Sequence, residues 1–164
     1  MAITVRTETL EDLDKIHSLT CIAFGQRGEA DLVDMLRGEG DLVVSLVAEE
    51  NGKIVGHVAL SKMVEPSGAL ALAPVSVDPI KQRAGIGSRL IQAAHAIAEQ
   101  DGWHTVFVLG DPNYYQRFGF RHEIAASFNT PYPKEFTMAL ELKPNSLDDL
   151  PGQLVYPAAF SKLD

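Results

Sequence analysis

The stretch that decides the fold runs from Val75 to Leu90 and reads Val-Ser-Val-Asp-Pro-Ile-Lys-Gln-Arg-Ala-Gly-Ile-Gly-Ser-Arg-Leu. It opens as a β-rich segment, passes through a loop with two glycines and continues with apolar residues at helical spacing. Gly85 and Gly87 lack Cβ atoms, so a ligand can approach the main chain there, and the first amides of the helix have no internal acceptors. The stretch therefore predicts an anion-binding turn between a strand and a helix.

The charges around this turn suit an anionic ligand. No Asp or Glu occurs from Pro79 to Ala98, whereas Lys81, Arg83 and Arg89 all fall there. The whole chain of 164 residues has 14 Lys and Arg against 22 Asp and Glu, a formal charge of −8. The turn is thus a positive island in an acidic chain, whose negative total argues against nucleic acid or anionic membrane as the main partner.

Two familiar nucleotide-binding motifs do not match this spacing. A P-loop ends in Gly-Lys-Ser or Gly-Lys-Thr, but here Gly87 is followed by Ser88 and Arg89. A dinucleotide fingerprint needs a third glycine or alanine where Leu90 stands. The glycines alone leave two alternatives open: a phosphometabolite or nucleotide site of another class, and a turn that only joins a strand to a helix.

Upstream of the turn, the pattern predicts a strand at 3–6 and two amphipathic helices. Thr9 and Asp12 form an imperfect capping box that opens the first helix, which ends near Phe24 and Gly25. Its predicted inward face comprises Leu10, Leu13, Ile16 and Thr20. The second helix, 29–36, directs Leu32, Val33 and Leu36 inward.

Three strands are predicted between these helices and the turn. Strands at 43–49 and 53–60 are joined by Asn51-Gly52, which suits a type I′ hairpin. Pro74 interrupts a third strand at 69–77 and, because proline cannot donate to a ladder, predicts a bulge, an edge or a local parting of strands.

Downstream, a helix is predicted at 85–100 and a buried strand at 105–109. Asp111-Pro112 begins a short helix that ends at Phe118 before Gly119. Alternation predicts a strand at 136–142, with a further one possible at 153–156. Strands and helices alternate only in part, so we expect one α/β domain, 1–164, with a mixed sheet, a core at about 3–143 and a C-terminal extension at 144–164.

The two conspicuous runs of the chain resemble motifs of a known family. Val77 to Gly87 is similar to motif A of the GNAT superfamily of N-acetyltransferases, written Q/R-x-x-G-x-G/A and preceded by a strand. Gly110 to Phe120, Gly-Asp-Pro-Asn-Tyr-Tyr-Gln-Arg-Phe-Gly-Phe, resembles motif B as it stands in the bacterial YhbS-like branch. The resemblance implies a GNAT fold over nearly the whole chain, with a central sheet splayed at a bulge.

The resemblance also implies how acetyl-CoA binds. The cofactor would lie in a V-shaped opening between two central strands, around Pro74 to Val77. Main-chain groups of Val75 and Val77 would pair with the pantetheine arm, and the amides of 83–88 would take the pyrophosphate. No metal is implied. The implied cofactor-binding residues are Val75, Ser76, Val77, Gln82, Arg83, Ala84, Gly85, Ile86, Gly87, Ser88 and Asn113.

Tyr115 corresponds to the family's tyrosine that protonates the leaving thiolate, so the resemblance implies that it is the general acid. The alternatives are that Tyr114 and Tyr115 are both packing residues and that Asn113 is an ordinary residue of a helix start. The general base is not identified: by residue type alone the candidates are Glu29, His57, Ser76, His122 and Glu123, with a water relay as the alternative.

The implied function is acetyl-CoA-dependent N-acetylation, by direct attack of a primary amine on the thioester. The acceptor, whether small molecule, peptide or protein, is not predicted. Acids at Glu29, Asp31 and Asp34 would attract a cationic amine or form a solvated helix face. The alternative function is a non-catalytic CoA-binding or regulatory GNAT-like domain.

Cysteine content and terminal patterns lead to expectations about location. Cys21, the single cysteine, provides neither an internal disulfide nor a thiolate metal site, so a reducing cytoplasm is expected. No signal peptide or membrane span is expected. The apolar stretch 154–160 would cover a sheet edge of its own chain or of a partner, which makes a homodimer possible.

Overall fold

A six-stranded mixed sheet forms the centre of the computed structural model, which describes residues 2–148 and 152–163. The strands lie in the order of the chain; β4 and β5 are parallel, and every other neighbouring pair is antiparallel. The strands are β1 (Thr4–Thr7), β2 (Leu42–Glu50), β3 (Lys53–Lys62), β4 (Ala69–Val77), β5 (Thr105–Leu109) and β6 (Thr137–Glu141). The predicted mixed sheet is confirmed.

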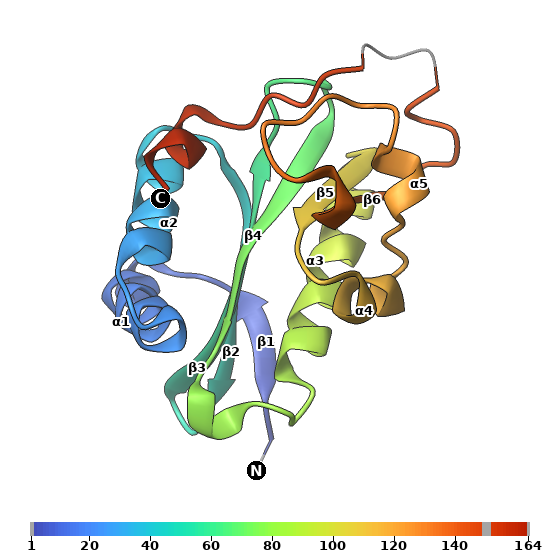
Figure 1. The fold of residues 1–164 in the computed structure, drawn as a ribbon. Helices are drawn as coiled ribbons and strands as arrows, with labels where there is room; N and C mark the ends of the chain where they lie inside the picture. The colour runs from blue at the N-terminus through green and yellow to red at the C-terminus, as the bar shows by residue number, and fades with distance from the viewer. Residues whose placement is uncertain (1, 149–151, 164) are drawn as a thin grey trace.

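Helices cover both faces of this sheet (Figure 1). Helices α1 (Leu13–Phe24) and α2 (Gly28–Gly38) lie on one face, and α3 (Ile86–Gln100) lies on the other with α4 (Pro112–Tyr115) beside it. The shorter elements are α5 (His122–Ala125) and the 3-10 turns η1 (Leu10–Asp12), η2 (Pro79–Lys81), η3 (Gln116–Phe118), η4 (Lys134–Phe136) and η5 (Ala158–Lys162). Within the described residues, none of the helices has the length and apolar character needed to cross a bilayer.

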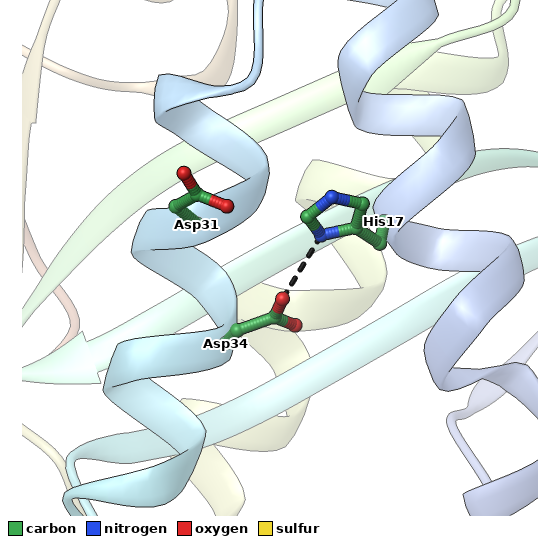
Figure 2. Close-up of side chains that lie close together, drawn as sticks. All are labelled: His17, Asp31 and Asp34. Carbon is green, nitrogen blue, oxygen red and sulfur yellow. Dashed lines mark hydrogen bonds and ion pairs between the residues drawn. The ribbon is translucent and has the colours of Figure 1, made fainter.

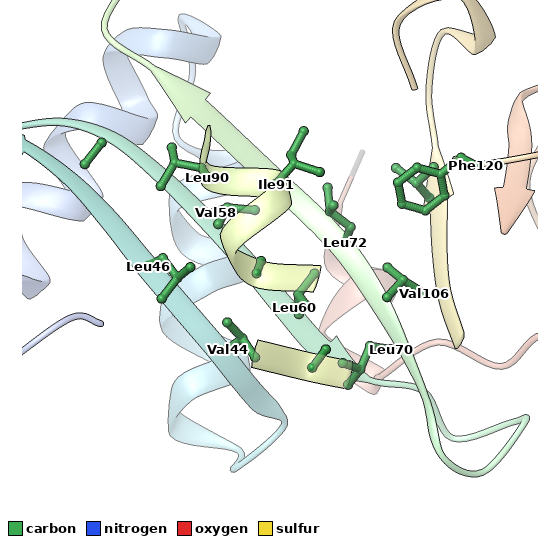
Figure 3. Packing of buried hydrophobic residues seen from close by; sticks show 14 of the residues in the cluster. Val44, Leu46, Val58, Leu60, Leu70, Leu72, Leu90, Ile91, Val106 and Phe120 are labelled. Carbon is green, nitrogen blue, oxygen red and sulfur yellow. The ribbon is translucent and has the colours of Figure 1, made fainter. Parts of the chain in front are cut away.

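The largest core fills the space between α3 and the sheet (Figure 3). Leu90 and Ile91 of α3 are fully buried against Val58, Leu60 and Leu72. A Cβ added to Gly56 of β3 would stand 2.8 Å from Ile86, so the missing side chain lets α3 lie directly on the strand. This close contact fixes the start of α3 relative to the sheet.

The opposite face of the sheet has its own core beneath α2 and the C-terminal segment. Phe107, Phe128 and Leu154 are buried there, and Phe160 is 7% exposed. The strand suggested at 153–156 is wrong, because this segment makes only isolated bridges, Val155 with Glu65 and Gln153 with Asn129. The apolar residues of the segment cover a face of their own chain. The predicted extension, 144–164, includes 149–151 and 164, which lie outside the described residues.

The N-terminal expectations are confirmed with one exception. The capping box is present, since Thr9 N donates to Asp12 Oδ2 at 2.7 Å, but it opens η1 before α1 begins at Leu13. Leu10 is 87% exposed, not buried as predicted, because it lies in that 3-10 turn, where helical spacing does not yet apply. The hairpin turn is confirmed: φ is +53° at Asn51 and +77° at Gly52, as a type I′ turn requires.

The most consequential feature of the sheet is a break between β4 and β5. Their pairing stops at Leu72 and Val108, and β4 continues to Val77 paired with β3 alone. On the β3 side, the register shifts between Val58 and Leu60, opposite a bulge that contains Ala73 and Pro74. The parting predicted from Pro74 is confirmed, and it leaves one edge of β4 free in the middle of the sheet.

Candidate functional site

A cavity of about 800 Å³ lies at this parting, on the α3 side of the sheet. Its walls come from the free part of β4, the loop before α3, the first turn of α3 and the short helix after β5. The lining residues are Val75, Val77, Gln82, Arg83, Gly85, Ile86, Gly87, Ser88, Asn113, Tyr114 and Arg117. The predicted phosphate turn and the predicted parting of strands thus belong to one cavity.

The turn before α3 presents unpaired amides to this cavity. Gly85, with φ of +79°, is the N-cap of α3, and the first amide bonded along the helix is that of Arg89, which donates to Gly85 O at 3.1 Å. The amides between these two residues have no acceptor within the helix, and they carry the positive end of its dipole. The loop therefore offers several N–H donors and partial positive charge to an anion.

Nine of the eleven residues predicted to bind the cofactor line this cavity. The other two lie elsewhere: Ser76 is buried with its side chain on the opposite face of β4, and Ala84 is exposed in the loop outside the lining. The nine that line it are Val75, Val77, Gln82, Arg83, Gly85, Ile86, Gly87, Ser88 and Asn113. Their role in binding stays a prediction.

The cations that line the cavity are not the same three that the sequence predicted. Lys81 pairs with Glu50 at 2.7 Å, and Arg89 donates to the carbonyl of Ile3 at 2.9 Å, so both are engaged away from the lining. Of the three predicted cations, Arg83 lines the cavity, and Arg117 joins it from beyond α4.

Two lining residues, Tyr114 and Arg117, were not assigned to the site by the sequence. Arg117 lies over the Tyr114 ring at 4.5 Å, and a Cβ at Gly87 would stand 2.9 Å from the Tyr114 hydroxyl. The two residues are three positions apart on a helical turn, so their side chains lie on one face. This spacing could have predicted from the sequence that they lie together. Tyr114 thus closes over the first turn of α3.

Tyr115 lies deeper than Tyr114, where β5 ends. Its ring packs edge-on against Phe120 at 5.8 Å and against the main chain of Gly110, the residue after β5. Tyr115 is not among the residues that line the cavity. Burial raises the pKa of its hydroxyl to about 12, so the phenol keeps its proton at neutral pH. Its assignment as the acid stays a prediction.

Two of the candidates for the base, Glu29 and Glu123, already make contacts elsewhere. Glu29 accepts a hydrogen bond from Gln26 at 3.0 Å, and Glu123 pairs with Arg121 at 3.0 Å on the surface. None of the five candidates lines the cavity.

The acids of α2 form a cluster with α1 (Figure 2). His17 Nδ1 lies 2.9 Å from Asp34, and ligand atoms of His17, Asp31 and Asp34 all fall within 4.8 Å of one another. Each carboxylate has an arginine beside it, Arg37 at 3.2 Å from Asp34 and Arg27 at 3.3 Å from Asp31. These pairs weaken the attraction that the two acids would exert on a cationic amine.

A second cavity, of about 540 Å³, lies between the loop at 129–132 and the C-terminal segment. Tyr132 and Tyr156 form its aromatic wall with ring centroids 5.0 Å apart, and Phe160 lies 5.3 Å beyond Tyr156. The segment that lines it belongs to the core under α2, so this cavity is on the sheet face opposite to the first.

Two buried histidines predict a loss of stability in mild acid. Burial lowers the pKa of His57 and of His95 to about 4 from 6.5, so each is neutral in the fold and protonates more readily when unfolded. Stability is therefore full above pH 6.5 and falls as pH approaches 4. Replacing His95, which packs edge-on against Phe120, by Leu should remove about 1–3 kcal/mol of this fall. Urea unfolding at pH 7, 5 and 4 measures it; an unchanged pH dependence contradicts the assignment.

Comparison with known proteins gives four consistent matches. A model of the acetyltransferase (GNAT) domain matches residues 41–122. The N-acetyltransferase YhbS of Escherichia coli K12 is 35% identical over 127 residues, 74% of each chain. The crystal structure of E. coli YhbS with CoA has a TM-score of 0.91 at 28% identity and covers 97% of this chain and 92% of that one. A GNAT family acetyltransferase from Brucella melitensis, solved with acetyl-CoA, has a TM-score of 0.82 at 34% identity and covers 97% and 98%.

Proposed function

The chain belongs to the GNAT family of N-acetyltransferases, and from this premise we propose that it transfers the acetyl group of acetyl-CoA to a primary amine by direct attack on the thioester. The observation that carries the proposal is the parting of β4 from β5, because it opens a cavity whose far end is the amide-rich start of α3. A long ligand with a phosphate at one end and an extended polar arm suits both ends of that cavity.

The family membership favours an enzyme over the other functions considered. A nucleotide-binding domain of another class has no support beyond the glycine turn. Two relatives were solved with CoA or acetyl-CoA, which supports the same ligand here. We place its pyrophosphate at the amides of 83–88 and its pantetheine arm along Val75 to Val77, where the free edge of β4 has unpaired main-chain groups. A single domain, 1–164, would hold the complete cofactor site.

The reaction needs an acid for the leaving thiolate and a way to deprotonate the amine. Tyr115, at the end of β5 beside the parting, would donate its proton to the sulfur. Its raised pKa keeps the phenol protonated at neutral pH, so the proton is available when the thiolate leaves. Alignment of the amine with the thioester supplies the remaining acceleration.

The proposed function is tested by binding and by transfer. Acetyl-CoA should bind with a stoichiometry of one in calorimetry, and ATP should not compete with it. A panel of polyamines, amino acids, peptides and aromatic amines should then contain at least one acceptor, detected as free CoA thiol and as acetylated product. Absence of acetyl-CoA binding would refute the proposal. Binding without transfer to any amine would favour the non-catalytic alternative.

Arg117 should contribute to acetyl-CoA affinity. It lies over the Tyr114 ring on the cavity wall, so Arg117→Ala removes a cation beside the expected phosphates and should weaken binding about 10-fold. Arg121→Ala is the matched control, because Arg121 is 65% exposed and pairs with Glu123 on the surface. Calorimetry at two salt concentrations measures both; equal affinities for the two variants would contradict the placement.

A further inference from the structure

A chain of hydrogen bonds on the α1–α2 face of the sheet ends at His57, a histidine with no exposed surface. Arg37 of α2 donates to Glu8 through Nε at 2.9 Å and Nη2 at 2.8 Å. The Ser45 hydroxyl donates to the same carboxylate, and Ser45 Oγ lies 2.8 Å from His57 Nε2. The chain thus crosses from the surface near β1 through β2 to β3.

The donors in this chain fix which nitrogen of His57 carries the proton. Glu8 is ionised, since the Arg37 and Ser45 donors hold its pKa below the usual value despite burial, and a carboxylate only accepts. Ser45 gives its one proton to Glu8, so it must accept from His57. His57 is therefore protonated on Nε2, and its Nδ1 carries a bare lone pair.

That lone pair faces a second unsatisfied group. Across the described residues, neither His57 Nδ1 nor Ser76 Oγ has a hydrogen-bond partner, although both atoms are buried. His57 and Ser76 are direct cross-strand partners in the β3–β4 ladder, and their side chains share one face. Residues in such pairs have Cβ atoms about 5 Å apart, so one water is enough to bridge the two groups, which are not bonded to each other directly.

Ser76 connects this pair to the reaction centre. It lies between Val75 and Val77, which line the cofactor cavity from the other face, in the part of β4 that has lost β5 as a neighbour. Unpaired buried polar groups are costly, and they persist where they serve a site.

We propose that His57, acting through Ser76, takes up the proton that the acceptor ammonium must lose before its nitrogen attacks the thioester. The inference rests on the proposed function and adds a residue to it. Ser76 accepts a proton from the ammonium, while its own proton passes through the bridging water to His57 Nδ1. The imidazolium is stabilised by Glu8 through Ser45, and its Nε2 proton leaves along Ser45 to the partly exposed carboxylate and to solvent. Tyr115 supplies the separate proton that the CoA sulfur requires.

The charges around His57 suit a transient acceptor. Its lowered pKa keeps the ring neutral and its Nδ1 lone pair free at pH 7, but burial disfavours the imidazolium, so the Nε2 proton must pass to Ser45 as the Nδ1 proton arrives. Burial is the main cause; Glu8 opposes it by favouring the imidazolium, and Arg37 adds to it.

The test compares two nucleophiles that differ in their need for a base. One is the best primary amine of the panel, protonated at pH 7; the other is methoxyamine, which is unprotonated at that pH and small enough for any acceptor site. His57→Gln keeps a donor toward Ser45 but has no useful basicity. It should lower kcat/KM for the primary amine about 100-fold and leave the rate with methoxyamine nearly unchanged. Ser76→Ala should act in the same direction with a smaller effect.

His95→Gln is the matched control, since His95 is also a buried neutral histidine but lies on α3. It should affect both nucleophiles equally. Equal losses for both nucleophiles in His57→Gln, with acetyl-CoA affinity intact, would overturn the relay and leave the proposed function standing. If His57→Gln does not fold, nitrogen NMR of the unmodified protein tests the relay instead. We expect His57 to be in its neutral Nε2–H form from pH 8 to 5. The opposite tautomer would overturn the relay.

Discussion

Replacing Gly87 by aspartate is expected to abolish acetyl-CoA binding while the chain still folds. A Cβ at this position would stand 2.9 Å from the Tyr114 hydroxyl, and the carboxylate beyond it would enter the cavity at the positive end of α3. A negative charge facing the pyrophosphate costs several kcal/mol, so the dissociation constant should rise by at least ~100-fold. Isothermal calorimetry measures this change, with thermal unfolding as the check on folding.

Two glycines elsewhere provide matched controls. Gly38 lies in α2 with nothing within 4 Å of its would-be Cβ, so Gly38→Asp adds a helical aspartate away from the site. Gly85→Asp introduces backbone strain as well as a negative charge, because φ at Gly85 is +79°. Gly102→Asp is the control for this strain, since φ at Gly102 is +91° and nothing lies within 4 Å of its would-be Cβ. If Gly87→Asp binds acetyl-CoA as tightly as Gly38→Asp does, the anion site is misplaced.

Replacing Tyr115 by phenylalanine is expected to lower kcat by ~10²-fold or more, with little change in acetyl-CoA affinity. The ring contacts with Phe120 and Gly110 survive this change, and only the proton donor is lost. Burial raises the pKa of the hydroxyl to about 12, so the activity of the intact enzyme should show no loss from tyrosine ionisation up to pH 9. Steady-state kinetics with the best amine acceptor measures both effects.

Tyr114→Phe separates the two neighbouring tyrosines. Tyr114 lines the cavity over Gly87, so losing its hydroxyl should raise KM for acetyl-CoA and leave kcat near normal. The two rings are perpendicular with centroids 4.9 Å apart, so a packing role would make the two variants alike. Similar losses of kcat in both variants would therefore contradict the role of Tyr115.

Local chemistry explains the parts of the molecule that the sequence predicted well. A turn with positive φ at Asn51-Gly52, a proline in β4 and a glycine N-cap at Gly85 each impose their geometry on few neighbours. Together with the family resemblance, which supplied the residue list, these local features predicted nine of the residues that line the cavity. The motifs that resemble the GNAT family extend this local information, because each describes one turn and the helix or strand beside it.

Features that depend on tertiary contacts were missed or mispredicted. Which residues of α4 and η3 face the cavity follows from their packing beside α3, so the sequence assigned neither Tyr114 nor Arg117 to the site. The segment at 153–156 alternates like a strand but packs as a loop, because its neighbours provide only single bridges. The relation of His57 to Ser76 is set by the register between β3 and β4, which no local pattern specifies.

The free edge of β4 has a consequence for the lifetime of the protein. Beyond Leu72 the main chain of β4 has β3 on one side and the cavity on the other, so a bound pantetheine arm would supply the missing partner. A ligand that binds only the native state at 100 times its dissociation constant adds about 2.7 kcal/mol to the free energy of unfolding. The rate of protease digestion depends on the fraction of molecules that are transiently unfolded. At this concentration of acetyl-CoA the rate should therefore fall about 100-fold. The amount of enzyme that survives in a cell would follow the supply of its own acyl donor.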